Sequence, residues 1–364
     1  MSKADHVYAR KVLPELTKEF ERAKTATYLF LPMIIGSIVL SVYTRSLAVA
    51  VVLMVIILGL YFFIFRKLGT EYAKHLSREN AVATVGALLK TDRFYTKGGA
   101  GLTEQDVREA ELIKTDAGNR KISFFDAMAG KCGRLPSVIT QDVAIAQNVG
   151  TGKRQGPAYV NCGNWIHAVL PKDTGLDLRV LQDTVMPDGD RELYFGARQD
   201  HLTERDPAEA GLSSEGWHLY LGKGTEPEQI PERFVKGLQS LREYTTGDLA
   251  VSVRGASADL YIRDRFLTLN YQSTTKPTEE VLTFDPFPEL TRVADLFETL
   301  LLEEERGAGR KRARMITVAE EQDRDGTGAE PAKAEPAPKE KDETGTEIMR
   351  AEPAPKEKDG TDAG

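Results

Sequence analysis

"SVYTRSLAV", residues 41–49, interrupts the most apolar part of the chain with a Thr-Arg-Ser cluster at 44–46. No other polar cluster occurs between positions 28 and 65. One helix over that range would be ~57 Å long, because each residue adds ~1.5 Å, whereas the hydrocarbon core of a bilayer is ~30 Å thick. Division at the cluster leaves two segments of suitable length, 25–43 and 47–65. The sequence therefore predicts two membrane-spanning helices joined by a tight turn.

Two alternatives to this hairpin fit the same region less well. A buried helical pair in a soluble core would be expected to show polar faces, yet residues 47–65 contain no strongly polar side chain. A cleavable signal peptide would start near the N-terminus, whereas the first apolar run begins only after a charged stretch of about two dozen residues. Tyr28, Tyr43 and Tyr61 stand toward the ends of the runs, as interfacial aromatics do.

Basic residues predict the orientation of the hairpin. They gather on the outer flank of each span, while the turn carries only Arg45. The flanking residues are Lys3, Arg10, Lys11, Lys18, Arg22, Lys24, Arg66, Lys67, Lys74 and Arg78. The positive-inside rule then places both termini in the cytoplasm and the turn outside.

Residues 1–24 show a pattern of their own. Tyr8, Val12, Leu16 and Phe20 recur at helical spacing among mixed charges, which predicts an amphipathic helix. Such a helix either lies on the inner membrane surface or packs on the protein's own cytoplasmic domain. The basic residues exceed the acidic ones only slightly, so the second interpretation is favoured.

The C-terminal region, 306–364, differs sharply in composition. The unit "AEPAPKEKD" occurs at 334–342 and again at 351–359, and no apolar periodicity surrounds it. A segment of this kind buries too little apolar surface to offset its ordering entropy, so we expect a disordered tail. Residues 320–364 contain 14 acidic and 7 basic residues, which accounts for the whole net charge of −7. The remainder is balanced and lacks the basic surplus of a general nucleic-acid-binding protein.

One basic cluster begins the tail, and it is the candidate contact for lipid headgroups or another polyanion. Its members are Arg306, Arg310, Lys311, Arg312 and Arg314. The alternative is that the cluster only ends a helix favourably, after the acidic run at 303–305.

Residues 67–305 are expected to form one α+β domain on the cytoplasmic side, with helices covering a sheet. A helix continues out of the membrane over 68–89, and Thr103 with Asp106 forms a capping arrangement for a short helix to about Ile113. Amphipathic helices begin at Pro231 and Pro288. An alternative with two lobes would divide the domain near the polar stretch 199–215.

Short segments rich in β-branched and aromatic residues predict the strands. "GAS" at 255–257 predicts a hairpin between the segments before and after it. The predicted strands lie at 121–127, 137–147, 157–170, 176–183, 217–223, 249–255, 258–264 and 266–271.

The order of these pieces resembles a bacterial membrane-protein family known as domain of unknown function three-one-three-seven. The resemblance covers roughly residues 10–304. After the two close spans it lies in "LTEQDVREAELI", "KISFFDA", "GPAYVNCGNWIHAVL", "HLYLGKGTEPEQIPERFVKGLQSL" and "DLAVSVRGASADLYI". It implies membrane anchoring in a bacterium, without an established activity and without functional residues to carry over.

Catalytic and metal motifs are weak. "NVGTGKRQG" at 148–156 echoes a phosphate-binding loop, but Gln147 stands in place of the first Gly and Arg154 in place of the Ser or Thr. No CxxC or helical His pair suggests a metal, so neither a cofactor nor a metal site is predicted. Cys162 and His167 are an odd number of residues apart on one predicted strand, which places them on opposite faces unless a bulge at Gly163 intervenes.

The stretch "RQDHLTERDPAEAG" gathers His201 with Asp200, Glu204 and Asp206. Acid–base chemistry or cation binding is conceivable there, although a solvated loop is favoured. Two cysteines suit a reducing cytoplasm. If the domain faced outward instead, Cys132 and Cys162 would be candidates for a disulfide, so their redox state would report the orientation.

Three classes of function stay open. The favoured one is a membrane-anchored, non-enzymatic interaction or scaffold protein of the bacterial inner membrane or a derived intracellular membrane. Its partners would be the lipid bilayer and a protein of unknown identity, and homo-oligomerisation stays open. The first alternative is a lipid-sensing or membrane-shaping protein that uses helix 1–24 and the basic cluster. The second is a membrane-tethered hydrolase with a pocket in the sheet domain.

Overall fold

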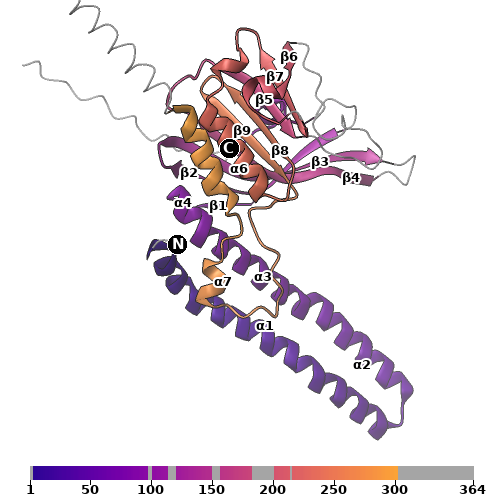
Figure 1. Cartoon of the computed structure of the whole chain (residues 1–364). Coiled ribbons are helices and arrows are strands. Elements are labelled where there is room, and N and C mark those ends of the chain that lie inside the picture. Colours follow the sequence, from indigo (N-terminus) through magenta and orange to yellow (C-terminus); the bar gives the residue numbers. More distant parts are fainter. Residues whose placement is uncertain are drawn as a thin grey trace, which may run out of the picture. The chain divides into compact units, whose positions relative to one another are not determined.

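The chain combines two long N-terminal helices with one antiparallel sheet and its covering helices, as the computed structural model shows (Figure 1). It describes residues 3–96, 101–113, 120–149, 156–182, 201–213 and 215–301. The α-helices are α1 (Lys3–Thr44), α2 (Leu47–Leu60), α3 (Arg66–Ala81), α4 (Ala87–Leu89), α5 (Glu104–Ala110), α6 (Glu232–Tyr244), α7 (Glu279–Thr283) and a last helix at 289–301. Mixed helix and antiparallel sheet confirm the predicted α+β class. The predicted tail and its repeats lie outside the described residues.

The Thr-Arg-Ser cluster forms the predicted turn. Helix α1 ends at Thr44, Arg45 adopts a left-handed φ of 50°, and α2 begins two residues later. The Thr44 hydroxyl donates to the carbonyl of Leu40 at 2.9 Å, which satisfies an acceptor at the helix end. The chain then runs back along α1, and the rings of Phe30 and Tyr61 lie 4.7 Å apart between centroids.

Both arms of the hairpin are long and apolar enough to cross a membrane, judged by length and composition. Their apolar side chains point outward and have no protein cover. Val42 is 73%, Leu47 81% and Phe63 79% exposed. Water solvates such surface poorly.

Each arm is a continuous helix that extends beyond its apolar segment. Residues 1–24, predicted as an amphipathic helix, belong to α1 together with the first apolar segment. The second arm runs from Leu47 to Leu89 through two π-helical turns, η1 (Tyr61–Phe65) and η2 (Val82–Gly86). It ends where Lys90 takes a left-handed φ of 54°, in agreement with the predicted end of the helix at residue 89.

One nine-stranded sheet contains all the described strands, in the order β1-β2-β3-β4-β9-β8-β5-β7-β6, and every pair is antiparallel. The strands are β1 (Phe94–Tyr95), β2 (Arg120–Cys132), β3 (Leu135–Val149), β4 (Gly156–Val169), β5 (Asp177–Gln182), β6 (Leu202–Arg205), β7 (Trp217–Gly222), β8 (Leu249–Arg254) and β9 (Ser257–Arg263). Seven predicted strands are confirmed. The β8–β9 hairpin turns at Gly255, whose φ is +57°, as the "GAS" signal predicted.

The two faces of the sheet have separate cores. Helix α6 and the helix at 289–301 cover one face, through Phe234, Leu238, Leu290 and Phe297 among others. The second arm enters the same core with Val82, Val85 and Leu89. The opposite face packs against residues 102–113, which include α5, and contains Trp165 and Tyr261. Both predicted amphipathic helices therefore cover the sheet.

The segment 266–271, predicted as a strand, is irregular in the structure, so this prediction was wrong. It belongs to a strap, residues 264–278, which connects β9 to α7. Helix α3 provides its partners: the hydroxyls of Ser77 and Tyr72 donate to the carbonyls of Leu269 and Thr275, each at 2.5 Å. Side-chain donors on a helix thus replace the neighbouring strand that an extended segment would otherwise need.

Other local predictions needed adjustment. Helix α5 has the predicted Thr103–Asp106 capping box but ends at Ala110, because Glu111 adopts a left-handed φ of 58°. The polar stretch 199–215 contains β6 and a 3-10 helix, η5 (Pro207–Ala210). Strands on both sides of this stretch belong to the same sheet.

Candidate functional site at the base of the hairpin

A charged cluster joins the two arms just beyond their apolar segments. His75 of α3 places one ring nitrogen 2.8 Å from the Glu19 carboxylate of α1 and the other 3.3 Å from Glu79. Tyr8 of α1 donates to Glu79 at 2.8 Å. A ring with carboxylates at both nitrogens is bound best as the doubly protonated cation. The hydrogen bond to Glu79, helped by Glu19 and opposed by burial, raises the pKa of His75 to about 9.

Apolar contacts complete this junction. The predicted stripe of residues 1–24 is buried: Leu16 and Phe20 pack with Tyr72 and Leu76 of α3 and with Leu282 of α7. Helix 1–24 therefore packs on the protein's own structure, which was the favoured interpretation. The apolar stripe that a membrane-surface helix would need is already covered by α3 and α7.

Asn80 of α3 fixes the chain around α7. Its amide nitrogen donates to the carbonyls of Val281, Leu282 and Phe284 at 3.0, 3.1 and 2.7 Å. The side chain is fully buried. Helix α7 is further tied to α1, because Glu279 accepts hydrogen bonds from Arg10 at 3.2 Å. The strap and α7 are thus held between the two arms.

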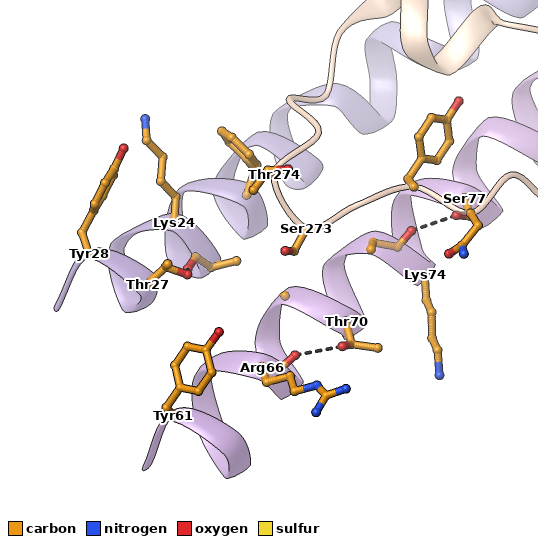
Figure 2. A pocket seen from close by; sticks show the side chains of 16 residues that line it. Lys24, Thr27, Tyr28, Tyr61, Arg66, Thr70, Lys74, Ser77, Ser273 and Thr274 are labelled. Carbon is orange, nitrogen blue, oxygen red and sulfur yellow. Dashed lines mark hydrogen bonds between the residues drawn. The ribbon is translucent and has the colours of Figure 1, made fainter. Parts of the chain in front are cut away.

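A cleft of about 760 Å³ opens where the arms leave their apolar segments. Figure 2 shows Lys24, Thr27 and Tyr28 of the first arm on one side, Tyr61, Arg66 and Thr70 of the second arm on the other, and Ser273 and Thr274 of the strap between them. The strap approaches closely because α3 has Gly69 there. A Cβ on Gly69 would lie 2.8 Å from the Cβ of Ser273. The volume of the cleft is within the range of small-molecule sites, about 300–1,000 Å³.

A second polar cluster lies on the α5-covered face of the sheet. Asp259 of β9 accepts a hydrogen bond from Trp165 at 2.9 Å and one from His167 at 2.8 Å. Burial lowers the pKa of His167, but the hydrogen bond and charge of Asp259 outweigh it and leave the pKa raised. The cluster is an internal hydrogen-bonded network centred on the Asp259 carboxylate.

Further polar residues lie beside this cluster on the neighbouring strands of the same sheet face. Ser252 pairs with Asp259 across β8 and β9, and Arg179 pairs with Ser252 across β5 and β8. The buried Arg179 guanidinium binds Asp177 at 2.7 Å and Glu111 at 3.0 Å. Asp259 lies between Ser252 and His167, so the hydroxyl and the imidazole are two strands, roughly 10 Å, apart. That separation is too large for a nucleophile and its base.

The sequence-based candidates are dispersed by the fold. Cys162 and His167 lie on opposite faces, because β4 is regular between them; its register shift comes earlier, between the partners of Ile145 and Ala146. His201 binds Glu111 at 3.2 Å. The other acids of the His201 group are not gathered around it: Glu204 faces His218 at 3.2 Å, Asp206 caps η5, and Asp200 lies outside the described residues.

Two further sequence signals fall on parts that the structure does not describe. Arg306, Arg310, Lys311, Arg312 and Arg314, the predicted headgroup contacts, all lie outside the described residues. So do residues 150–155 of the phosphate-loop-like stretch, although its flanks are the paired strands β3 and β4. No group of His, Cys, Asp and Glu within the described ranges could hold a metal ion.

The Cys132–Cys162 disulfide that was considered for an outward-facing domain does not fit the geometry. Cys162 pairs with Ala144 on β3, and Ala144 pairs with Ser123 on β2. Cys132 lies nine positions further along β2, at the β2–β3 turn. At ~3.3 Å per residue this separation exceeds ~20 Å even with two bulges, whereas a disulfide needs Cα atoms within ~7 Å. The redox state of this pair therefore carries no information on orientation.

Sequence reasoning missed the cleft and the strap. Their residues come from positions separated by about 200 residues, and the strap residues Asn270, Tyr271, Ser273 and Thr274 have no motif of their own. Lys24, Arg66 and Lys74 had been noted only as topology signals, Tyr28 and Tyr61 as interfacial aromatics, and Phe20 as part of an amphipathic stripe. No known protein family and no curated protein matches this chain. The roles of these residues accordingly rest on geometry.

Proposed function

We propose that this chain is a membrane-anchored, non-enzymatic binding or scaffold protein of the bacterial cytoplasmic membrane. In this proposal the α1–α2 hairpin crosses the bilayer, and both termini and the sheet domain lie on the cytoplasmic side. The basic residues on the outer flanks of the spans support that orientation.

The observation that carries the proposal is a contrast within the same two helices. Around the turn they present bare apolar side chains, such as Val42 and Leu47. Away from the turn, both helices are covered by other parts of the protein. Leu16 of α1 and Leu89 of the second arm are buried in its apolar cores. A bilayer covers the first part, and the protein covers the second.

The close fit of the second arm against the sheet supports a scaffold role. Gly130 of β2 abuts the end of α4, and a Cβ at that position would lie 2.1 Å from the carbonyl oxygen of Leu89. The sheet domain is thus attached to the anchor by packed contacts as well as by the chain. An anchor of this kind presents its domain at the membrane surface in a fixed orientation.

The partners of the polar clusters support the non-enzymatic interpretation. Asp259 is occupied by Trp165 and His167, and Arg179 is occupied by Asp177 and Glu111. Within the described ranges, no Ser, Thr or Cys hydrogen-bonds to the second nitrogen of His167. Among these described residues, the hydrolase alternative therefore has no observation in its favour.

Extraction of membranes with alkaline carbonate tests the anchoring. We expect the full chain to stay in the membrane pellet, whereas Val52→Arg with Ile56→Arg releases it, because each arginine costs about 2.5–3.5 kcal/mol at the bilayer centre. Both side chains are more than half exposed, so their replacement leaves the protein's internal packing intact. Tyr159→Arg with Val169→Arg, at exposed positions of β4, is the matched control and should stay in the pellet. Release of the unmodified chain would overturn the proposal.

A further inference from the structure

The cleft at the base of the hairpin has a one-sided charge. Its 16 lining residues include Lys24, Arg66 and Lys74 and no carboxylate. Within the described ranges, Arg66 and Lys74 have no ion-pair partner, and Lys24 has only Glu21, at 3.9 Å. The lining of the cleft therefore carries a net positive charge, which favours an anion.

The cleft also lies at a defined depth in the proposed membrane. Lys24 is the last charged residue before the first apolar segment, and Arg66 is the first one after the second. Tyr28 and Tyr61, one turn further toward the bilayer, line the same cleft (Figure 2). Tyrosine and basic residues mark the headgroup region of a bilayer, where the anionic phosphates of lipids lie.

The part of the cleft nearest the apolar segments is suited to an apolar chain. Tyr28 and Tyr61 contribute aromatic surface there, whereas Phe20, Gly69 and Ala73 line the part of the cleft on the other side of Lys24 and Arg66. Beyond Tyr28 the surface continues into the uncovered apolar side chains of the hairpin. A ligand that fits both parts has an anionic head and a hydrocarbon tail.

We propose that this cleft binds one anionic glycerophospholipid from the surrounding bilayer. Its phosphate lies beside Arg66, while Lys24 and Lys74 add positive charge from the two arms, its glycerol lies near the strap hydroxyls of Ser273 and Thr274, and its acyl chains follow the outside of the hairpin. This inference rests on the proposed function, because it requires the hairpin to lie in a bilayer. The strap would then contact the lipid directly and couple membrane composition to the sheet domain.

The test uses the full chain in nanodiscs of phosphatidylcholine with a minor fraction of phosphatidylglycerol, followed by native mass spectrometry of the released protein. We expect one phosphatidylglycerol molecule to be retained in preference to phosphatidylcholine. The triple variant Lys24→Gln, Arg66→Gln, Lys74→Gln should weaken this retention at least about tenfold. The matched triple variant Lys11→Gln, Lys18→Gln, Lys67→Gln removes the same charge from exposed positions outside the cleft and should change it less than about threefold.

A second variant fills the cleft without changing its charge. Thr70 is exposed and lines the cleft, and its hydroxyl only donates to the carbonyl of Arg66 in its own helix, at 2.9 Å. Thr70→Trp should therefore abolish retention and leave the fold intact. Equal loss in both triple variants, or undiminished retention in Thr70→Trp, would overturn the inference.

Two further outcomes separate the possible failures. Competition by soluble glycerol phosphate or inorganic phosphate at the affinity of the lipid would overturn the lipid assignment, because the site would then recognise the phosphate alone. A carbonate-resistant chain that retains no phosphatidylglycerol would overturn the inference and leave the anchoring intact. A chain that carbonate releases would overturn the proposed function and this inference together.

Discussion

At the residue scale, the buried carboxyl group of Asp142 links two parts of the fold. It accepts hydrogen bonds from the Asn164 side chain at 2.8 Å and from the backbone N–H of Leu267 at 2.9 Å, so it ties the strap to β3. Burial raises its pKa to about 7 despite these hydrogen bonds. The folded protein therefore holds a proton on Asp142 at pH values where the unfolded chain has lost it.

This difference in the pKa of Asp142 between the folded and unfolded states predicts that the free energy of unfolding depends on pH. The stability contributed by the protonated carboxyl is complete below the unfolded pKa of 3.8 and is lost as the pH rises to about 7. Asp142→Asn keeps the acceptor oxygen and cannot ionise, so we expect its stability relative to the parent chain to rise by a few kcal/mol between pH 4 and pH 8. Thermal unfolding of both proteins across that range measures it. A constant difference between the two curves would contradict the assignment.

The contacts of individual side chains were the hardest feature to predict from the sequence. The distance between Cys162 and His167 along one strand was enough to place them on opposite faces, because strand geometry alternates side chains regularly. The partners of buried charges were not predictable. Asp259, which binds Trp165 and His167, comes from a strand about 90 residues away and has no local signal.

At the element scale, the strap depends on donors from α3. Asn80→Ala would remove the side-chain donor from the carbonyls of Leu282 and Phe284, while the Val281 carbonyl keeps the Tyr271 hydroxyl at 3.1 Å. Each unsatisfied buried carbonyl costs about 1–3 kcal/mol. We expect faster amide hydrogen exchange over residues 264–284, with little change in β8 and β9. Thr84→Ala, one turn further along, removes a hydroxyl that only bonds to the carbonyl of Asn80, and it should leave the strap protected.

Elements with strong periodic patterns were predicted correctly. The turn at 44–46, the helix from Pro231 and the β8–β9 hairpin each have a local signal, respectively a polar interruption, an apolar stripe and a glycine turn. The strap at 264–278 was misassigned in part, because "FLTLNY" resembles a strand and its real partners are on α3. Strand β6 was missed because its four residues are largely polar.

At the scale of the whole molecule, the second arm connects three environments in one helix. It starts at the turn with uncovered apolar side chains, passes the cleft, and ends inside the core of the sheet at Leu89. The sequence predicted the turn, the apolar segment and the helix to residue 89 in this order, but not the cleft. It did not predict their mutual packing, because the contacts join residues near positions 8–24, 69–89 and 267–284.

Site-directed thiol labelling tests the central claim, a hairpin that crosses the membrane and returns. Arg45→Cys at the turn and Lys236→Cys on α6 are each introduced into a Cys162→Ser chain, in which Cys132 is buried. Intact spheroplasts are treated with a membrane-impermeant maleimide before and after permeabilisation. We expect immediate labelling of Arg45→Cys and labelling of Lys236→Cys only after permeabilisation. Labelling of both positions on the same side would contradict the hairpin, and the reverse order would contradict its orientation.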